Sequence, residues 1–370
     1  MYLSHLSLKN FRSYGELELP LTQGVTIFLG KNGEGKTNIV ESMLYLAFLS
    51  SHRTSSDQPL VRLGENSAYI RARIVNDERD LLVELEINAE KANRARINQN
   101  PVRSQKELFG ALVCVYFSPE DLDLVRGDPA ERRRFIDQLI TSRNPRMAGV
   151  ISDYDRAVRQ RNSLLKTRSH SSSLQSWDEQ VALYGGEIIA ARLNLLNEFT
   201  PVFTDVYREI STKKPATIGY KSSIDNPTTS PQANSEIILQ KMNEIKFQEL
   251  ERGLTLVGPH RDDLLLQLGD HLVKGYASHG ESWSIALSLK LASYQLLREE
   301  GAQPILILDD VFSELDEERR DQLVALAHSA EQTFVTVAVA SDLPADLTGT
   351  TYQVKSGSVK IIKTGVVDDE

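Results

Sequence analysis

A glycine-rich octapeptide near the N-terminus constrains this sequence more than any other feature. Residues 30–37 read Gly-Lys-Asn-Gly-Glu-Gly-Lys-Thr and match the phosphate-loop pattern G-x-x-x-x-G-K-[ST]. The loop follows a continuous apolar run, residues 25–29, and precedes residues 38–49, which are apolar on one helical face. A buried strand, the loop and a helix are therefore expected in this order, which is typical of an α/β nucleotide-binding fold.

The loop itself supplies most of the predicted nucleotide ligands. Its glycines let backbone N–H groups point at phosphates, and the helix that follows adds its positive end. Lys36 is expected to reach the β- and γ-phosphates and to take part in catalysis, and Thr37 to place its hydroxyl on Mg²⁺. ATP and Mg²⁺ are therefore the predicted cofactors. The predicted nucleotide ligands in this segment are Gly30, Lys31, Asn32, Gly33, Glu34, Gly35, Lys36, Thr37 and Asn38.

A second chemical motif lies about 270 residues downstream of the loop. Residues 304–310 read Pro-Ile-Leu-Ile-Leu-Asp-Asp, which predicts a buried strand that ends in carboxylates. Ligands of open α/β sheets bind at the carboxyl edge of the strands. We therefore expect Asp309 to hold Mg²⁺ and Asp310 to orient or deprotonate the attacking water.

A third motif precedes this acidic strand by about 30 residues. Residues 278–282 read Ser-His-Gly-Glu-Ser and open a predicted helix, where free N–H groups can bind an anion. An ordinary helix N-cap is the alternative on local grounds. The position is the one at which ABC-type ATPases carry their signature, so Ser278 and Gly280 are predicted nucleotide ligands. Residues 313–316, Ser-Glu-Leu-Asp, are similar to the D-loop of the same class.

Strand-like segments at both ends of the chain enclose a long helix-rich region. We predict an ABC-type ATPase head, an α/β phosphate-loop lobe with a mixed sheet, that carries an inserted α-helical lobe. Residues 1–120 and 254–370 would form the ATPase lobe, and residues 121–253 the insert. Within and after the insert we predict helices at 132–163, 174–206 and 236–251, a stretch that is mainly loop at 211–235, and strands at 254–257 and 264–268.

The charge of the chain is acidic overall but locally basic. The formal net charge is −9, yet residues 91–106 hold five Lys or Arg and no acid, and residues 141–170 hold seven against two Asp. Such islands can grip a polyanion, although a solvated surface is the alternative. Cys114 is the single cysteine, so an intrachain disulfide is excluded. No secretory leader and no apolar stretch of about 18 residues are visible, so we expect a cytoplasmic protein without membrane contact.

Several segments together resemble one known family. Residues 8–14 read Leu-Lys-Asn-Phe-Arg-Ser-Tyr, 117–122 Phe-Ser-Pro-Glu-Asp-Leu and 258–263 Gly-Pro-His-Arg-Asp-Asp. With Arg-Arg-Arg-Phe-Ile-Asp at 132–137 and the motifs above, the sequence resembles the bacterial RecF family over essentially its full length.

This resemblance carries expectations about structure and function. It implies a head like that of SMC proteins, without a long coiled coil, and weak DNA-stimulated ATP hydrolysis. It implies an ATP-dependent homodimer that clamps DNA and works with RecR and RecO to load the recombinase at single-strand gaps, in DNA replication, recombination, repair and the SOS response. In the matching segments, Arg12 would contact the nucleotide and Glu120 the metal.

Two departures and three alternatives stay open at this point. Glu281 stands where the family usually has Gln in the signature, and residues 338–342, Ala-Val-Ala-Ser-Asp, lack the switch histidine of transporters. A transporter subunit would need that histidine and a Leu-Ser-Gly-Gly-Gln signature, and an SMC-type head would need a much longer heptad insert. A non-hydrolysing scaffold is the third alternative, since Asp310 replaces the longer Glu of fast ABC ATPases. The preferred DNA structure is also open.

Overall fold

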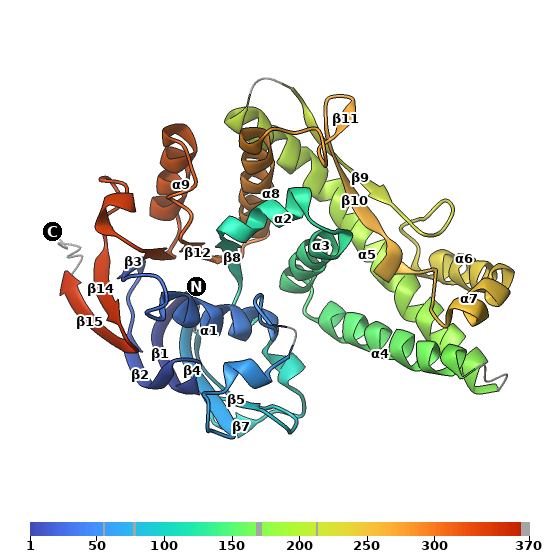
Figure 1. Ribbon diagram of the computed structural model, residues 1–370, viewed down its shortest axis with the longest axis horizontal. Coiled ribbons are helices and arrows are strands. Elements are labelled where there is room, and N and C mark those ends of the chain that lie inside the picture. The colour runs from blue at the N-terminus through green and yellow to red at the C-terminus, as the bar shows by residue number, and fades with distance from the viewer. Residues whose placement is uncertain (55, 77–78, 168–171, 212–213, 364–370) are drawn as a thin grey trace. The chain divides into compact units, whose positions relative to one another are not determined.

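The buried strand before the phosphate loop, β3 (Gly24–Leu29), lies inside a six-stranded sheet (Figure 1). The computed structural model describes residues 1–54, 56–76, 79–167, 172–211 and 214–363. The chain divides into two compact units, Met1–Asp121 with Ser293–Glu370 (unit 1) and Leu122–Ala292 (unit 2). The sequence placed the second boundary at residue 253, whereas residues 254–292 group with the helical unit, because β10 (Asp263–Leu268) pairs with β9 (Ala216–Lys221).

Unit 1 consists mainly of strands, with one helix directly after the phosphate loop. Its strands are β1 (Tyr2–Phe11), β2 (Tyr14–Pro20), β3, β4 (Ser67–Asn76), β5 (Arg79–Asn88), β6 (Arg94–Ile97), β7 (Asn100–Pro101), β8 (Cys114–Phe117), β12 (Ile305–Asp309), β13 (Gln332–Val337), β14 (Thr350–Lys355) and β15 (Ser358–Lys363). Its helices are α1 (Lys36–Phe48) and α9 (Glu317–Ser329).

The first sheet of unit 1 places the two chemical motifs at one edge. Its strand order is β15-β14-β3-β13-β12-β8, and every pair is parallel except β14 with β15. All residues of β12 and β13 are buried, as their continuous apolar runs predict. Because β3 and β12 both pair in parallel with β13, the loop after β3 and the carboxylates that end β12 emerge at the same edge.

The second sheet of unit 1 is antiparallel and has one polar face. Its strand order is β2-β1-β4-β5-β6-β7. Along β4, Ala68, Ile70 and Ala72 are buried, while Arg71 and Arg73 on the opposite face are exposed. This period of two is what a sheet with one solvated face requires.

Unit 2 is mainly helical. Its elements are α2 (Leu122–Arg126), α3 (Pro129–Arg143), α4 (Arg146–Lys166), α5 (Ser172–Ile210), β9, α6 (Pro231–Glu244), α7 (Lys246–Arg252), β10 and β11 (His271–Leu272), and α8 (His279–Glu299) begins here and ends in unit 1. The long helix α5 packs against α4, α6 and β9. A three-stranded sheet, β11-β10-β9, completes the unit.

One local expectation was incomplete and another was wrong. The predicted loop at 211–235 contains β9, whose backbone pairs with β10 from Asp263↔Lys221 to Leu268↔Ala216. The predicted strand at 254–257 does not form, because side chains take the hydrogen bonds that a neighbouring strand would make. Thr255 N donates to Asn162 Oδ1 at 2.7 Å, and Thr255 O accepts from Arg261.

A buried ionic network lies beneath this segment. Arg161, 1% exposed, donates to Glu249 Oε2 and to Asp178 Oδ1, each at 2.6 Å. His260 lies beside it, with Nδ1 2.6 Å from the Tyr154 hydroxyl and Nε2 3.1 Å from Thr255 O. Every charged group of the cluster thus has a partner, as burial demands.

Candidate functional site

The phosphate loop is shaped by glycines that no other residue can replace without movement. A Cβ on Gly30 would lie 2.3 Å from Val354 O, and one on Gly35 would lie 2.8 Å from the Tyr14 hydroxyl oxygen. Gly35 also has φ +112 and is the residue from which α1 starts. The first turn of α1 holds no acidic residue. Its N–H groups therefore face the loop without a competing negative charge.

Lys36 is held across the loop by two oxygens. Its side chain is 3% exposed, and Nζ donates to Gly30 O at 2.8 Å. Nζ also lies 3.8 Å from Asp310 Oδ2. The structure therefore brings together the two residues predicted to be catalytic, although they lie far apart in the sequence.

Asp309 ends β12 as a buried carboxylate with two hydroxyl donors. Thr336 Oγ1 donates to Oδ1 at 2.5 Å, and the Tyr116 hydroxyl donates to Oδ2 at 3.3 Å. Burial outweighs these hydrogen bonds and raises the pKa of Asp309 to about 6, with the charges of Asp310 and Glu120 adding to the rise. A carboxylate in this state gains from a nearby cation, which favours its ionised form.

Asp310 has an unusual backbone conformation. Its φ is +52, in the left-handed region that non-glycine residues seldom adopt. Its N–H donates to Thr336 O at 3.2 Å and to Thr336 Oγ1 at 3.1 Å, and these bonds hold the conformation. Strained backbone of this kind is concentrated at functional sites.

The donors present fit a magnesium ion that arrives with a nucleotide. Within the described residues, no group of three or more His, Cys, Asp or Glu side chains forms a metal cage. Mg²⁺ is usually bound by one or two carboxylates together with water and substrate phosphates. Asp309, Glu120 and the half-buried Thr37 match that description. Glu120 is exposed just after β8, which pairs with β12 through Phe117↔Leu308.

Arg12 is fixed beside α1 by a buried glutamate that the sequence did not point to. Its Nε and its terminal nitrogen donate to Glu41 at 2.8 and 2.5 Å, and Glu41 is fully buried. Arg53 lies 3.6 Å from the same carboxylate and donates to Asn38 Oδ1 at 3.1 Å. Glu41 and Arg53 were not predicted as site residues from the sequence, because neither belongs to a motif.

The remaining loop residues differ in what they offer a ligand. Lys31, Asn32 and Gly33 are exposed. The Glu34 carboxylate accepts hydrogen bonds from the backbone N–H and the hydroxyl of Ser356, which lower its pKa. The Glu34 side chain therefore anchors the loop to the β14–β15 turn, and the Glu34 backbone N–H donates to Lys31 O at 3.2 Å within the loop.

The predicted signature segment lies in unit 2 and forms a capping box. Ser278 N donates to Glu281 Oε2 at 2.8 Å, and Glu281 N donates to Ser278 Oγ at 3.2 Å. These bonds to Ser278 lower the pKa of Glu281, and Lys214 Nζ lies 3.7 Å from the carboxylate. Ser278 itself is exposed and Gly280 partly so. The Glu281 carboxylate, whose role as a ligand the sequence left in doubt, thus accepts a hydrogen bond from the backbone at the start of the helix.

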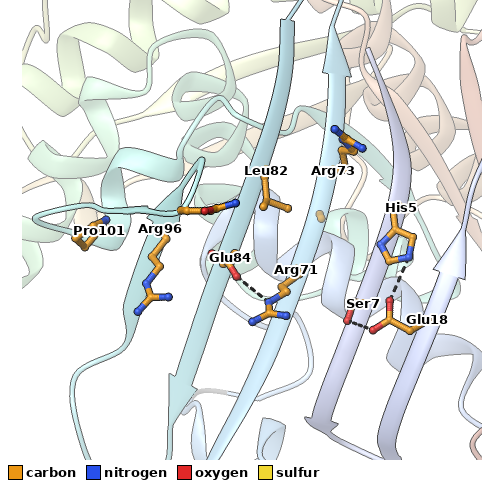
Figure 2. A pocket seen from close by; sticks show the side chains of 11 residues that line it. His5, Ser7, Glu18, Arg71, Arg73, Leu82, Glu84, Arg96 and Pro101 are labelled. Atoms are coloured by element: carbon orange, nitrogen blue, oxygen red, sulfur yellow. Dashed lines mark hydrogen bonds and ion pairs between the residues drawn. The ribbon is translucent and has the colours of Figure 1, made fainter.

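Basic side chains from β4 and β6 share the polar face of the antiparallel sheet (Figure 2). A pocket of 720 Å³ lies on this face, lined by His5, Ser7, Glu18, Arg71, Ala72, Arg73, Leu82, Glu84, Arg96, Gln99 and Pro101. Arg71 pairs with Glu84 at 2.7 Å. In the part of the chain that the structure describes, Arg94 and Arg96 make no ion pair. Two of the five basic residues of the first island, Arg94 and Arg96, are thus without an ion pair among the described residues, and Arg168 of the second island lies outside those residues.

No helix among the described residues combines the length and the apolar character that a membrane crossing requires.

Known proteins resemble this chain in sequence and in fold. The family model described as "RecF/RecN/SMC N terminal domain" matches residues 2–357. The DNA replication and repair protein RecF of Streptomyces avermitilis is 51% identical over 371 residues, which cover 97% of this chain and 100% of that protein. A solved structure described as "recombination mediator protein RecF-ATP in RecFOR pathway" is 28% identical, covers 98% of both chains and has a TM-score of 0.89.

A more distant structure bears on the fold alone. The Smc head bound to the C-winged helix domain of ScpA has a TM-score of 0.57 at 16% identity and covers 98% of this chain and 97% of its own. These likenesses confirm the predicted α/β ATPase-head fold with its helical region. By full-length sequence identity and fold, the chain belongs to the RecF family of DNA replication and repair proteins.

Proposed function

We propose that this protein binds Mg²⁺-ATP and uses it to join two copies of itself on DNA during recombinational repair. The observation that carries the proposal is the convergence of Lys36, Asp309 and Asp310 at the mouth of the phosphate loop. The description of the similar solved structure as a RecF-ATP complex of the RecFOR pathway supports ATP as the ligand and RecO and RecR as partners.

The residues have separate roles in this proposal. Lys36, Thr37 and Asp309 hold Mg²⁺-ATP in one copy, and Ser278 of the second copy caps the γ-phosphate. Ser278 suits this role because it is exposed, and because Glu281 N donates to its Oγ at 3.2 Å and so fixes the position of the side chain. A ligand that bridges two copies stabilises the pair by mass action. When bound, Mg²⁺ neutralises charge on the phosphates.

Light scattering with and without ATP tests the dimer. Wild type should shift from monomer to dimer with Mg²⁺-ATP. Lys36→Arg should stay monomeric, because the larger guanidinium cannot occupy the buried position of Lys36 Nζ. Asp310→Asn should bind ATP and accumulate as a dimer, since the base for hydrolysis is gone. A wild type that stays monomeric with ATP under all conditions would refute the clamp.

DNA would be held through its backbone by the polar face of the antiparallel sheet. Arg94 and Arg96 are the candidates there, because other arginines of the face are paired with acids. Such binding should be independent of sequence and sensitive to salt. In filter binding, Arg96→Ala should reduce the slope of log affinity against log salt by about 1. Arg208→Ala on α5, where Arg208 pairs with Asp205, is the matched control and should leave the slope unchanged.

A second candidate function is a scaffold that binds ATP without hydrolysing it. The contact between Lys36 and Asp310 favours it, since Lys36 Nζ lies 3.8 Å from the carboxylate that would have to act on the attacking water. Phosphate release measured with and without DNA separates the two functions. DNA-stimulated release that disappears in Asp310→Asn supports a weak DNA-dependent ATPase, and no release above background supports the scaffold.

A further inference from the structure

An exposed tyrosine ring stands two residues before Ser278. Tyr276 is 76% exposed, which is unusual for so large an aromatic side chain. Its ring stacks on His271 of β11, with centroids 5.7 Å apart and an interplanar angle of 21°. Leu272, next to His271, is 44% exposed. Apolar surface is therefore gathered directly beside the signature segment.

The segment that carries this ring is well anchored. Val273 is 2% exposed, and its N–H donates to Leu266 O of β10 at 2.9 Å. Val273 O then accepts from Tyr276 N at 3.1 Å and from Ala277 N at 3.0 Å, which closes a turn. Gly275 in this turn has φ +91, a conformation that favours glycine.

Contacts on either side complete the anchoring. Lys274 Nζ donates to Gly127 O at 2.9 Å, and Arg126 Nε donates to Ser282 Oγ at 3.1 Å, one turn into α8. The backbone from β10 to α8 is thus fixed by the core of unit 2. The ring of Tyr276 is held outward as part of a built surface.

Chain geometry links this surface to the proposed dimer. Two residues of fully extended chain span at most about 7 Å, so the Cα of Tyr276 lies within that distance of the Cα of Ser278. If Ser278 caps a phosphate held by a second copy, Tyr276 must lie within a nucleotide's length of that copy's phosphate loop. A ring this exposed and this close to the proposed contact is available to pack against the second copy when the copies meet.

We propose that Tyr276, supported by His271, is an anchor of the ATP-dependent interface and packs against the second copy of this chain beside its phosphate loop. This inference rests on the proposed function, because Ser278 must act across the two copies. Tyrosine suits such a position, since it buries a large rigid area and is enriched among the residues that dominate binding energy. The surface opposite would include the exposed Lys31, Asn32 and Gly33 of the second copy.

Sedimentation velocity over a protein dilution series with saturating Mg²⁺-ATP tests the inference. Tyr276→Ala should weaken the dimer by about tenfold or more, as truncation of an anchoring residue does. Tyr276→Phe should stay within about threefold of wild type, because the ring provides the contact. Phe247→Ala on α7 is the matched control, since Phe247 is another aromatic side chain, 86% exposed, away from the signature. It should dimerise like wild type.

The outcomes separate the inference from the proposed function. Binding of a fluorescent ATP analogue to dilute, monomeric Tyr276→Ala should match wild type, and so should its melting temperature. If Ser278→Ala abolishes the dimer while Tyr276→Ala dimerises like wild type, the role of Tyr276 is refuted and the clamp stands. If wild type does not dimerise, or if Ser278→Ala dimerises normally, the clamp fails and the inference fails with it. Equal losses in Tyr276→Ala and Phe247→Ala would also refute it, as a nonspecific effect of surface truncation.

Discussion

Replacing Thr336 by valine should lower the affinity of the nucleotide site for Mg²⁺ and leave the fold intact. The Thr336 hydroxyl donates to Asp309 Oδ1 at 2.5 Å, while burial raises the pKa of that carboxyl to about 6. The hydroxyl therefore favours the ionised carboxylate, which is the form that binds a metal. A hydrogen bond to a charged group contributes about 1.5–3 kcal/mol, and the loss of such a partner lowers metal affinity about 10- to 100-fold.

The assay is a Mg²⁺ titration of fluorescent-ATP binding at a fixed nucleotide concentration and constant pH. The Mg²⁺ midpoint of Thr336→Val should rise by about 10- to 100-fold, and Thr336→Ser should restore it. Thr333→Val is the matched control: Thr333 is a buried threonine of the same strand whose hydroxyl donates to Ala327 O at 3.0 Å. If Thr336→Val and Thr333→Val have the same midpoint, the reasoning about Asp309 is refuted.

Three further predictions concern unit 2. Burial lowers the pKa of His260 to about 4, so the unfolded chain takes up a proton below about pH 6.5 before the folded chain does. The free energy of unfolding should therefore fall as the pH drops from 6.5 to 4, with about 3 kcal/mol from this residue. Urea unfolding measured over this pH range should give His260→Gln a smaller change of unfolding free energy with pH than wild type. Glu249→Gln should lose about 3 kcal/mol in the same assay, because Arg161 stays buried without one of its two carboxylates. Glu281→Ala should cost about 1 kcal/mol of helix capping and weaken the ATP-dependent dimer, whereas Glu281→Gln, which keeps the capping box, should behave as wild type.

The phosphate loop and the acidic strand were predictable because each is a local pattern with a physical cause. Glycines at fixed spacing and an apolar run that ends in Asp309 and Asp310 need no knowledge of the rest of the chain. The strand pairing then brings the two motifs to one edge, through β13 between them. The fold class and the place of the helical insert followed from patterns of the same kind, and the family resemblance added the likeness to an SMC head without a long coiled coil.

The partners that hold these residues were not predictable, because tertiary contacts supply them. Thr336 lies 27 residues from Asp309 in the chain, and Tyr116 lies 193 residues from it. A threonine in a buried strand and a tyrosine in an apolar run have no pattern that marks them as donors to a carboxylate. Glu41, a buried acid inside α1, is similarly invisible until Arg12 is seen beside it.

The same distinction explains why Glu281 looked out of place in the sequence. Read as a ligand, a carboxylate at this position would repel a γ-phosphate. In the structure the Glu281 carboxylate accepts a hydrogen bond from Ser278 N, and Ser278 Oγ accepts one from Glu281 N. The carboxylate therefore caps the start of the helix. That reciprocal pair of bonds fixes Ser278 at the exposed start of α8. The residue that seemed to argue against Ser278 as a ligand is therefore the one that positions it, and a glutamine would do so by the same two bonds.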